Sequence, residues 1–216
     1  MKIEILYEDD FILAANKPAG LPSHATHDPL RPHFQGALET QVGQELVLFH
    51  RLDLDTTGVV LFGKVPEMNK PFTEMFRDRL AKKTYWAVVQ GRWPADWTEV
   101  RTFIKKGGGG RWMNVPKGKG GDLALSEFTT LKTNGEKTHI EVRPQTGRTH
   151  QIRLHCLERG HPIMGDKLYG RAHPQGVPMA LHARSLEFIH PKTNKPLKIE
   201  ATPPTYWQEV WLKQLV

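Results

Sequence analysis

The chain has 216 residues, of which 38% are hydrophobic and 25% charged, and its formal net charge is +7. This length and composition are typical of a globular protein with a buried core. No apolar run approaches the ~20 residues that span a bilayer, the N-terminal segment lacks a secretory apolar core, and the single cysteine, Cys156, excludes an intramolecular disulfide. We therefore expect no membrane association and a cytoplasmic location, and the positive charge favours nucleic acid as a partner.

Most of the chain carries short alternating or β-branched apolar runs, which predict strands separated by turns. Two strands around the acidic turn Glu8-Asp9-Asp10 come first, and Asn134-Gly135 is typical of a hairpin turn between two later strands. The other predicted strands cover residues 46–49, 59–62, 83–91, 180–190 and 196–201. Because consecutive strands pair antiparallel, we predict an α+β fold with a mainly antiparallel sheet.

Three helices are predicted among these strands. Apolar side chains at helical spacing indicate an amphipathic helix over residues 66–83, and a second helix is expected over residues 149–159 with Gly160 as its C-terminal cap. A third helix at the C-terminal end carries Trp207, Val210, Trp211 and Leu215 on one stripe. No linker interrupts the pattern, so we expect a single domain over residues 1–216.

Residues 105–121 read KKGGGGRWMNVPKGKGG and combine many glycines with lysine and arginine. Such a composition is typical of a flexible loop. Two interpretations remain open for this segment: a tolerated surface insertion, or a basic arm that settles on phosphates.

The stretch LFHRLDLDTTGVVLFGK, residues 48–64, places polar groups between two apolar runs. Asp55 and the Thr-Thr-Gly that follows are typical of a turn. Arg51 and Asp53 flank the apolar Leu52, so an alternating backbone sends both to one side, where the cation keeps the carboxylate ionised, as a nucleophile should be. A structural ion pair explains the same pattern, and these residues alone leave both interpretations open.

A second cluster of charge lies in RPQTGRTHQIRLH, residues 143–155. Arg148 and Arg153 fall before and within the first turns of the helix that we predict here. Cations at a helix N-terminus oppose the macrodipole by ~0.3–1 kcal/mol each, and a bound phosphate or carboxylate offsets such a penalty. An anion site and an exposed basic helix are equally compatible with this segment.

The chain has eleven histidines, but their spacing does not indicate a metal site. His24 and His27 lie three apart in a loop without an obvious third ligand, and His150 and His155 point to different faces of a helix. The motifs GxxxxGK[ST], GxGxxG after a strand, and HExxH do not occur, so nucleotide, dinucleotide and zinc-protease chemistry lack support. We expect neither a metal nor a cofactor.

Several motifs together resemble a known family. HRLDLDTTG closely resembles the HRLDxxTSG signature of the RluA family of pseudouridine synthases. NKPAGLPSH resembles the family's KPxG segment, KKTYWAVVQG its KxYxAxVxG strand, and TGRTHQIRLH its third motif. HPIMGDKLYG and LHARSLEFIHP match the two segments that usually follow, so the similarity covers about residues 6–201 in the family's order.

The resemblance implies an enzyme that isomerises specific uridines in tRNA or rRNA to pseudouridine. The N1–C1′ glycosidic bond breaks, the uracil turns while it is held, and C5 bonds to C1′. No electrons or groups are exchanged, so no cofactor is required. The implied fold is a mixed, mainly antiparallel sheet with flanking helices and loops, and with a central active-site cleft.

Residue by residue, the resemblance assigns the catalytic aspartate to Asp53 rather than Asp55. The strand tyrosine, which packs against the target base and is a candidate general base, falls on Tyr85, and the arginine that pairs with the aspartate falls on Arg153. The residues expected to contact RNA or line the site are Arg51, His50, Arg148, His150, Gln151 and Lys17.

The chain departs from the family pattern in two places. Thr57 stands where the family usually has Ser, and both residues offer a hydroxyl for the turn. Many relatives carry an N-terminal S4 RNA-binding domain, and we expect none here, which resembles the small members that act on tRNA and rRNA. We also expect a monomer.

Two other functions remain as alternatives. A catalytically silent RNA-binding module on the same fold has no need of Asp53, Tyr85 and Arg153, all of which are present. A glycoside hydrolase or nucleosidase would use Asp53 and Asp55 as a carboxylate pair and release free uracil or sugar.

Overall fold

The computed structural model describes residues 2–28, 30–170, 176–213 and 215. Its internal contacts divide the chain into two compact units, each of which is described by itself. Unit 1 comprises Met1–Lys83 and His182–Pro203, and unit 2 comprises Thr84–Leu181 and Pro204–Val216. That the whole chain acts as one catalytic domain stays a prediction.

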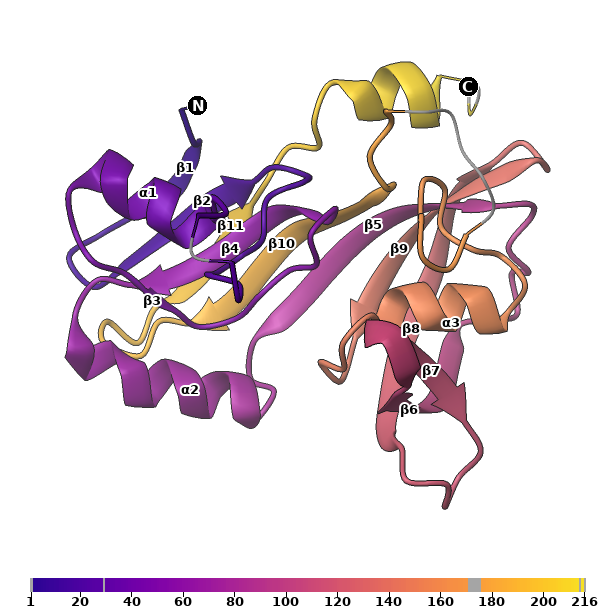
Figure 1. Cartoon of the computed structure of the whole chain (residues 1–216), viewed down its shortest axis with the longest axis horizontal. Coiled ribbons are helices and arrows are strands. Elements are labelled where there is room, and N and C mark those ends of the chain that lie inside the picture. Colours follow the sequence, from indigo (N-terminus) through magenta and orange to yellow (C-terminus); the bar gives the residue numbers. More distant parts are fainter. Residues whose placement is uncertain (1, 29, 171–175, 214, 216) are drawn as a thin grey trace. The chain divides into compact units, whose positions relative to one another are not determined.

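Unit 1 is built on strands in the order β1-β2-β4-β10, with β3 paired to β4 and β11 paired to β10 (Figure 1). Neighbouring strands are antiparallel except β4 and β10, which are parallel. The elements are β1 (Ile5–Glu8), β2 (Ile12–Lys17), α1 (Phe34–Val42), β3 (Val47–Leu48), β4 (Thr57–Gly63), the 3₁₀ helix η1 (Pro66–Met68), α2 (Asn69–Arg77), β10 (Leu181–Ile189) and β11 (Pro196–Glu200).

The core of unit 1 forms between this sheet and α2. Every residue of β4 is buried, and Phe72 and Met75 of α2 pack against Ile12 and Val59 of the sheet. The predicted helix over residues 66–83 is therefore present but shorter, because the chain turns through Arg79 at φ 59° and β5 begins at Lys82.

Unit 2 carries strands in the order β5-β9-β8-β6-β7, each antiparallel to its neighbour. Its elements are β5 (Lys82–Gln90, which begins in unit 1), β6 (Glu99–Lys106), the 3₁₀ helix η2 (Gly108–Gly110), β7 (Trp112–Val115), β8 (Asp122–Thr133), β9 (Lys137–Pro144), α3 (Gln151–Glu158) and the terminal π-helix η3 (Trp207–Leu212). The core contains Val88, Ile140 and Ile152 with Trp207 and Trp211, so η3 closes over it as the apolar stripe predicted.

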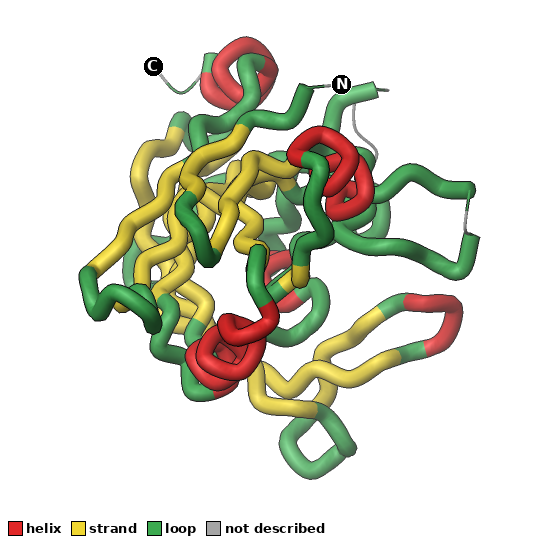
Figure 2. The backbone as a smooth tube through the Cα atoms, turned by 90° about the vertical axis from the view of Figure 1, so that its left-hand side faces the viewer, coloured by secondary structure: helices red, strands yellow, loops and turns green. Residues whose placement is uncertain are grey.

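The segment 105–121 has more regular structure than its composition predicted. Lys105 and Lys106 end β6, the glycines form η2, and residues 112–115 return as β7, which pairs with β6 (Figure 2). Gly109 adopts φ 61°, so a glycine allows the tight reversal at the tip. Glycines therefore serve the turn, while the apolar residues around Trp112 and Ile104 pack beneath it.

The predicted fold class is confirmed. The strands are mixed and mainly antiparallel, helices and loops flank them, and the hairpin turn at Asn134-Gly135 joins β8 to β9 as expected. The cap of α3 is also confirmed at its C-terminal end, where Gly160 has φ 76° and His161 N–H donates to the Cys156 carbonyl at 2.9 Å.

Candidate functional site

Asp53 lies in the loop of unit 1 that joins β3 to β4. The Thr56 N–H donates to the Asp53 carbonyl at 3.2 Å, which closes a four-residue turn with Leu54 and Asp55 at its centre. The turn is therefore two residues earlier in the chain than the sequence indicated, because Thr57 already belongs to the buried strand β4. Asp53 stands at the first position of the turn with its side chain half-buried.

The backbone on one side of Asp53 is held by Ser23. The Ser23 hydroxyl donates to the Leu52 carbonyl at 2.8 Å and accepts from the Leu52 N–H at 3.0 Å, and Ser23 is buried. A hydroxyl that both donates to and accepts from one residue fixes that residue's peptide groups in place.

The backbone on the other side of Asp53 is held by Lys17 and Gly20. The Lys17 ammonium donates to the Leu54 carbonyl at 3.0 Å, and the Gly20 N–H donates to the same oxygen at 2.9 Å. The segment NKPAGLPSH therefore holds the peptide group that precedes Asp53, through Ser23, and the Leu54 carbonyl in the middle of the turn, through Lys17 and Gly20.

Lys17 is 0% exposed, and its ammonium also donates to the carbonyls of Pro18 and Leu21, at 2.8 and 2.7 Å. Burial lowers the pKa of Lys17 to about 8, against the charges of Asp55 and Asp53, which act to raise it. The ammonium is enclosed by carbonyls and its contacts shape the loop, while the expected RNA contact of Lys17 stays a prediction.

Two further residues of the HRLD motif lie in different surroundings. Arg51 is exposed, as a residue that contacts RNA should be. His50 is partly buried: its Nε2 accepts from the Leu61 N–H at 3.1 Å, and its ring lies 5.0 Å from that of Phe76. Burial, with the charge of Lys83, lowers the pKa of His50 to about 3, so this imidazole is neutral and anchors the loop to β4.

Tyr85 lies on β5 in unit 2, opposite Val142 of β9. Its side chain is half-buried and packs against the core of the unit. A strand position of this kind leaves a ring partly accessible on a rigid support, which suits stacking against a base.

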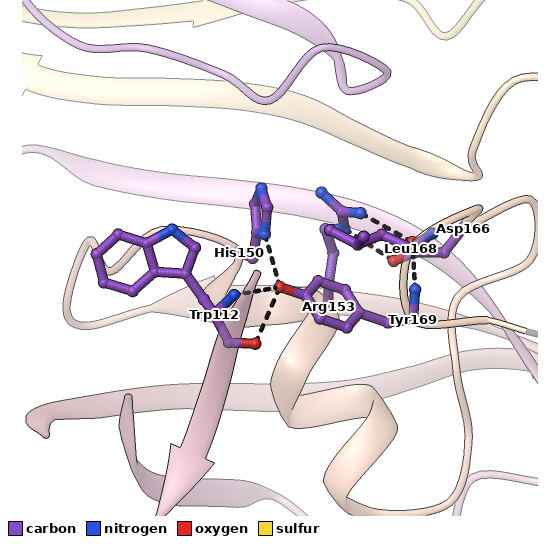
Figure 3. A network of polar contacts seen from close by, with 6 residues as sticks. All are labelled: Trp112, His150, Arg153, Asp166, Leu168 and Tyr169. Carbon is purple, nitrogen blue, oxygen red and sulfur yellow. Dashed lines mark hydrogen bonds and ion pairs between the residues drawn. The ribbon is translucent and has the colours of Figure 1, made fainter. Parts of the chain in front are cut away.

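Arg153 lies on α3, in the network of polar contacts drawn in Figure 3. Its Nε and Nη2 atoms each donate to a carboxylate oxygen of Asp166 at 2.8 Å, which makes a bidentate ion pair. The Tyr169 ring lies under the guanidinium, with its centroid 4.9 Å from Cζ. Arg153 is 8% exposed and Asp166 is 1% exposed, so most of this pair is shielded from water.

Asp166 stays ionised despite its burial. Burial acts to raise the pKa of this carboxyl, but the hydrogen bonds and charge of Arg153 and the N–H groups of Tyr169 and Leu168 outweigh it, so the pKa lies below its usual value. The two N–H groups donate to Asp166 Oδ1 at 3.1 and 2.9 Å.

His150 precedes α3 in a left-handed conformation, with φ 57°. Its Nδ1 lies 2.8 Å from the Tyr169 hydroxyl, which also contacts the N–H and the carbonyl of Trp112, at 3.0 and 3.1 Å (Figure 3). A residue other than glycine in this conformation is uncommon and is held by its surroundings. His150, rather than Thr149, therefore marks the start of the helix.

Gln151 and Arg148 lie beside this network. The Gln151 side chain is buried and donates to the Leu125 carbonyl at 2.9 Å and to the Ser126 hydroxyl at 2.8 Å. Its amide oxygen accepts from the Thr146 hydroxyl and the Arg148 N–H, so these hydrogen bonds serve the turn, and its expected RNA contact stays a prediction. Arg148 is partly exposed, which suits a phosphate contact.

Asp166 and Tyr169 are the functional candidates that the sequence did not single out. Both belong to HPIMGDKLYG, which matched a family segment without an assigned role. Their partners are distant in sequence, so only the folded chain brings them to Arg153 and His150.

The part of the chain that the structure describes contains no cluster of three or more His, Cys, Asp or Glu side chains arranged to hold a metal ion. In the same part, no helix is long and apolar enough to cross a membrane.

Comparisons with known proteins show the family of this chain. The family model described as RNA pseudouridylate synthase matches residues 11–158. The dual-specificity RNA pseudouridine synthase RluA of Vibrio cholerae is 36% identical over 89% of this chain and 79% of its own length. The ribosomal large subunit pseudouridine synthase C of the same organism is 33% identical over 97% of this chain and 68% of its own length.

Among solved structures, the human RNA pseudouridylate synthase domain containing 4 superposes with a TM-score of 0.75 and 26% identity, over 94% of this chain and 90% of that chain. The match in sequence thus extends to the fold. The chain belongs to the RluA family of RNA pseudouridine synthases, enzymes that isomerise uridine in RNA to pseudouridine.

Proposed function

We propose that this enzyme uses Asp53 as its catalytic carboxylate. The observations that carry the proposal are the hydrogen bonds around this residue: Ser23 holds the Leu52 peptide before it, the Thr56 N–H holds its own carbonyl, and Lys17 with Gly20 hold the Leu54 carbonyl one residue later. A clamp on both sides of one side chain fixes its direction, as a reacting group requires. Asp55 lies at the third position of the same turn, and the resemblance of HRLD to the family motif assigns the role to Asp53 rather than to Asp55.

The chemistry suits an ionised carboxylate. Such a group can attack C1′, stabilise an oxocarbenium ion that develops there, or help to remove a proton from the sugar. In each route the uracil leaves C1′ through N1 and returns through C5, and the C5 proton is released to water. Atoms and electrons balance without a further reactant.

Tyr85 and Arg153 complete the proposed catalytic set. The target base must leave its stack at a cost of a few kcal/mol, and an aromatic face such as that of Tyr85 offsets ~1–3 kcal/mol by stacking. The guanidinium of Arg153 favours negative charge on the catalytic carboxylate. Asp53 belongs to unit 1 and the other two to unit 2, so their action on the same uridine is part of the proposal.

We further propose that the substrate is a tRNA, an rRNA or both, and that Arg51, Arg148 and His150 contact it. The names of the two Vibrio cholerae relatives support this choice, since one is a dual-specificity enzyme and the other acts on the large ribosomal subunit. A cytoplasmic, monomeric enzyme is the form that we propose, because such RNAs are found there and the site residues named here all come from one chain.

Tritium release from RNA labelled at uridine C5 tests the carboxylate assignment. Asp53→Asn should release no tritium above background while it binds RNA with near wild-type affinity. Asp55→Asn is the matched control: it is the other half-buried aspartate of the same loop, and it should retain measurable turnover.

Full activity of Asp53→Asn would contradict the assignment, and equal loss in both variants would show that the wrong carboxylate was chosen. Free uracil among the products would support a nucleosidase instead. Tyr85→Phe and Tyr85→Leu separate proton transfer from stacking, and wild-type rates in both would remove Tyr85 from the site. Carbodiimide mapping of total RNA, with and without the enzyme, identifies the target uridines.

A further inference from the structure

Tyr169 connects the two expected site residues of unit 2. Its ring lies against the guanidinium of Arg153, its N–H donates to the carboxylate of Asp166, and its hydroxyl contacts His150 (Figure 3). Arg153 and His150 are three positions apart at the start of α3, so one tyrosine fixes both side chains from outside the helix.

The hydrogen bonds of the Tyr169 hydroxyl determine which nitrogen of His150 carries a proton. A phenol has one proton to donate and two lone pairs to accept with. The Trp112 carbonyl, at 3.1 Å, can only accept, so it takes the phenolic proton; the Trp112 N–H, at 3.0 Å, can only donate. The remaining lone pair faces His150 Nδ1 at 2.8 Å, so that nitrogen carries a proton.

A neutral imidazole protonated at Nδ1 has its lone pair on Nε2. In this form of His150 the lone pair lies on Nε2, whereas the guanidinium of the neighbouring Arg153 carries only donors. The left-handed backbone of His150 indicates that the surroundings impose this orientation at some cost in strain.

The pairing of Arg153 with Asp166 is equally specific. Replacement of a buried ion pair by apolar residues is often neutral or stabilising, so such a pair is weak evidence for stability. Two hydrogen bonds of 2.8 Å and a stacked ring fix the plane of the guanidinium, whose other N–H groups are thereby aimed in a set direction.

We propose that Asp166 and Tyr169 are positioning residues for the isomerisation: together they set the plane of Arg153 and the Nδ1-protonated form of His150. This inference rests on the proposed function of Arg153 and His150. Neither positioning residue itself touches the reacting atoms.

Four variants test the proposal, with kcat, KM and RNA affinity measured for each. Tyr169→Phe removes the hydroxyl and keeps the ring, and it should lower kcat about 10- to 100-fold with little change in KM, as misplacement by about 1 Å does. Asp166→Asn removes the charge but keeps an oxygen for the two backbone N–H groups, and it should lower kcat similarly.

The controls are Tyr7→Phe and Asp9→Asn. Like Tyr169→Phe, the substitution Tyr7→Phe removes a hydrogen-bonded hydroxyl. Asp9 accepts from the Phe11 and Ile12 N–H groups, just as Asp166 accepts from two backbone N–H groups. Both lie in unit 1, outside the proposed site, and both should keep wild-type kcat.

Nitrogen-15 NMR of the histidine side chains reports which ring nitrogen of His150 carries the proton. This signal would not change in Tyr169→Phe if Tyr169 had a purely structural role. We assign the His150 signals by their loss in His150→Gln. Wild-type His150 should show a protonated Nδ1 and a lone pair on Nε2, and Tyr169→Phe should shift the population toward the other neutral form.

Wild-type kcat in folded Tyr169→Phe and Asp166→Asn would overturn the proposal, and so would a wild-type His150 protonated at Nε2 alone. A loss of thermal stability with unchanged kcat would assign both residues to folding only. Absence of tritium release by the wild-type enzyme on any RNA would instead contradict the proposed function, and the NMR result would still decide how Tyr169 sets His150.

Discussion

Thr57 and His182 form a buried hydrogen bond of 2.8 Å between the threonine Oγ1 and the imidazole Nδ1. The other nitrogen, Nε2, lies 3.0 Å from the Ala201 carbonyl, which can only accept, so Nε2 carries the proton and Nδ1 accepts from Thr57. The hydroxyl expected to serve a turn therefore fastens the first residue of β4 to the parallel strand β10. The loop of Asp53 ends on this fixed point.

Thr57→Val should destabilise the protein. The substitution keeps the shape of the side chain but leaves the buried Nδ1 acceptor of His182 without its donor, at a cost of about 1–3 kcal/mol in the free energy of unfolding. Thr57→Ser keeps the hydroxyl and should lose less than Thr57→Val. Urea unfolding at neutral pH measures both, and a Thr57→Val variant as stable as the wild type would contradict the role of this bond.

The free energy of unfolding should decrease as the pH drops from about 6.5 to about 4. The upper limit is the usual pKa of histidine in an unfolded chain. Burial lowers the pKa of His182, His139 and His155 to about 4 each, so in this range the unfolded state binds protons that the folded state does not. The free energy of unfolding then decreases by up to ~1.4 kcal/mol per pH unit for each such histidine.

The variant His182→Gln isolates one of these contributions. Its unfolding free energy should depend less steeply on pH by about one proton between these limits, whereas His27→Gln, at an exposed position, should leave the slope unchanged. Urea unfolding at a series of pH values gives the slopes. Equal slopes in His182→Gln and the wild type would show that His182 titrates alike in both states.

Lys17→Met should lower kcat without weakening RNA binding. The ammonium is enclosed, so its loss removes no contact with RNA, but the Leu54 carbonyl loses one of its two donors and the turn that carries Asp53 loosens. We expect about a tenfold or greater loss of kcat. Lys64→Met is the matched control, since Lys64 pairs with Glu8 at the edge of unit 1 and should keep wild-type kcat.

A direct role in binding predicts the opposite pattern for Lys17→Met. RNA affinity, measured by fluorescence anisotropy, would then fall while kcat at saturation stayed constant. Arg51→Ala is the reference for lower RNA affinity with an unchanged kcat at saturation, because Arg51 is exposed in the same loop region and is expected to contact RNA.

Local signals predicted the elements that depend on neighbours in sequence. Asn134-Gly135 predicts a hairpin between two strands, and Gly160 predicts the end of α3, so both features were predicted correctly. The helix α1 was missed, because it follows a proline-rich segment, contains Gly36 and begins at His33, whose Nδ1 accepts from the Gly36 N–H. A histidine cap is outside the usual Ser, Thr, Asp and Asn signals.

The candidate site was predicted only in part for a similar reason. The motif pointed to Asp53 and Arg153, but their supports lie far away in sequence: Leu54 accepts from Lys17, 37 residues earlier, and Arg153 pairs with Asp166, 13 residues later. No pattern of local spacing distinguishes a lysine that clamps a loop from one that binds phosphate. Burial, which decides between the two, is a property of the folded chain.

The β6–β7 hairpin and the loop that joins β7 to β8 are expected to bind RNA phosphates. Residues 100–121 contain six lysines and arginines and no acidic residue, and Lys106, Arg111, Lys117 and Lys119 are exposed. Across the described residues, none of these four forms an ion pair with an acidic side chain, so their charges are available to a polyanion. The hairpin is also anchored, since Asn114 donates to the Leu154 carbonyl of α3 at 3.1 Å.

The double variant Lys117→Ala/Lys119→Ala should therefore weaken RNA binding and reduce its dependence on salt. Each lost phosphate contact lowers the slope of log affinity against log salt concentration by about 0.7–0.9, since fewer counterions are released. Lys192→Ala/Lys195→Ala, which removes the same charge from exposed positions in unit 1, should leave the slope unchanged. Anisotropy titrations over a salt series decide the point: equal slopes in the two double variants would show that Lys117 and Lys119, in the loop between β7 and β8, make no phosphate contact.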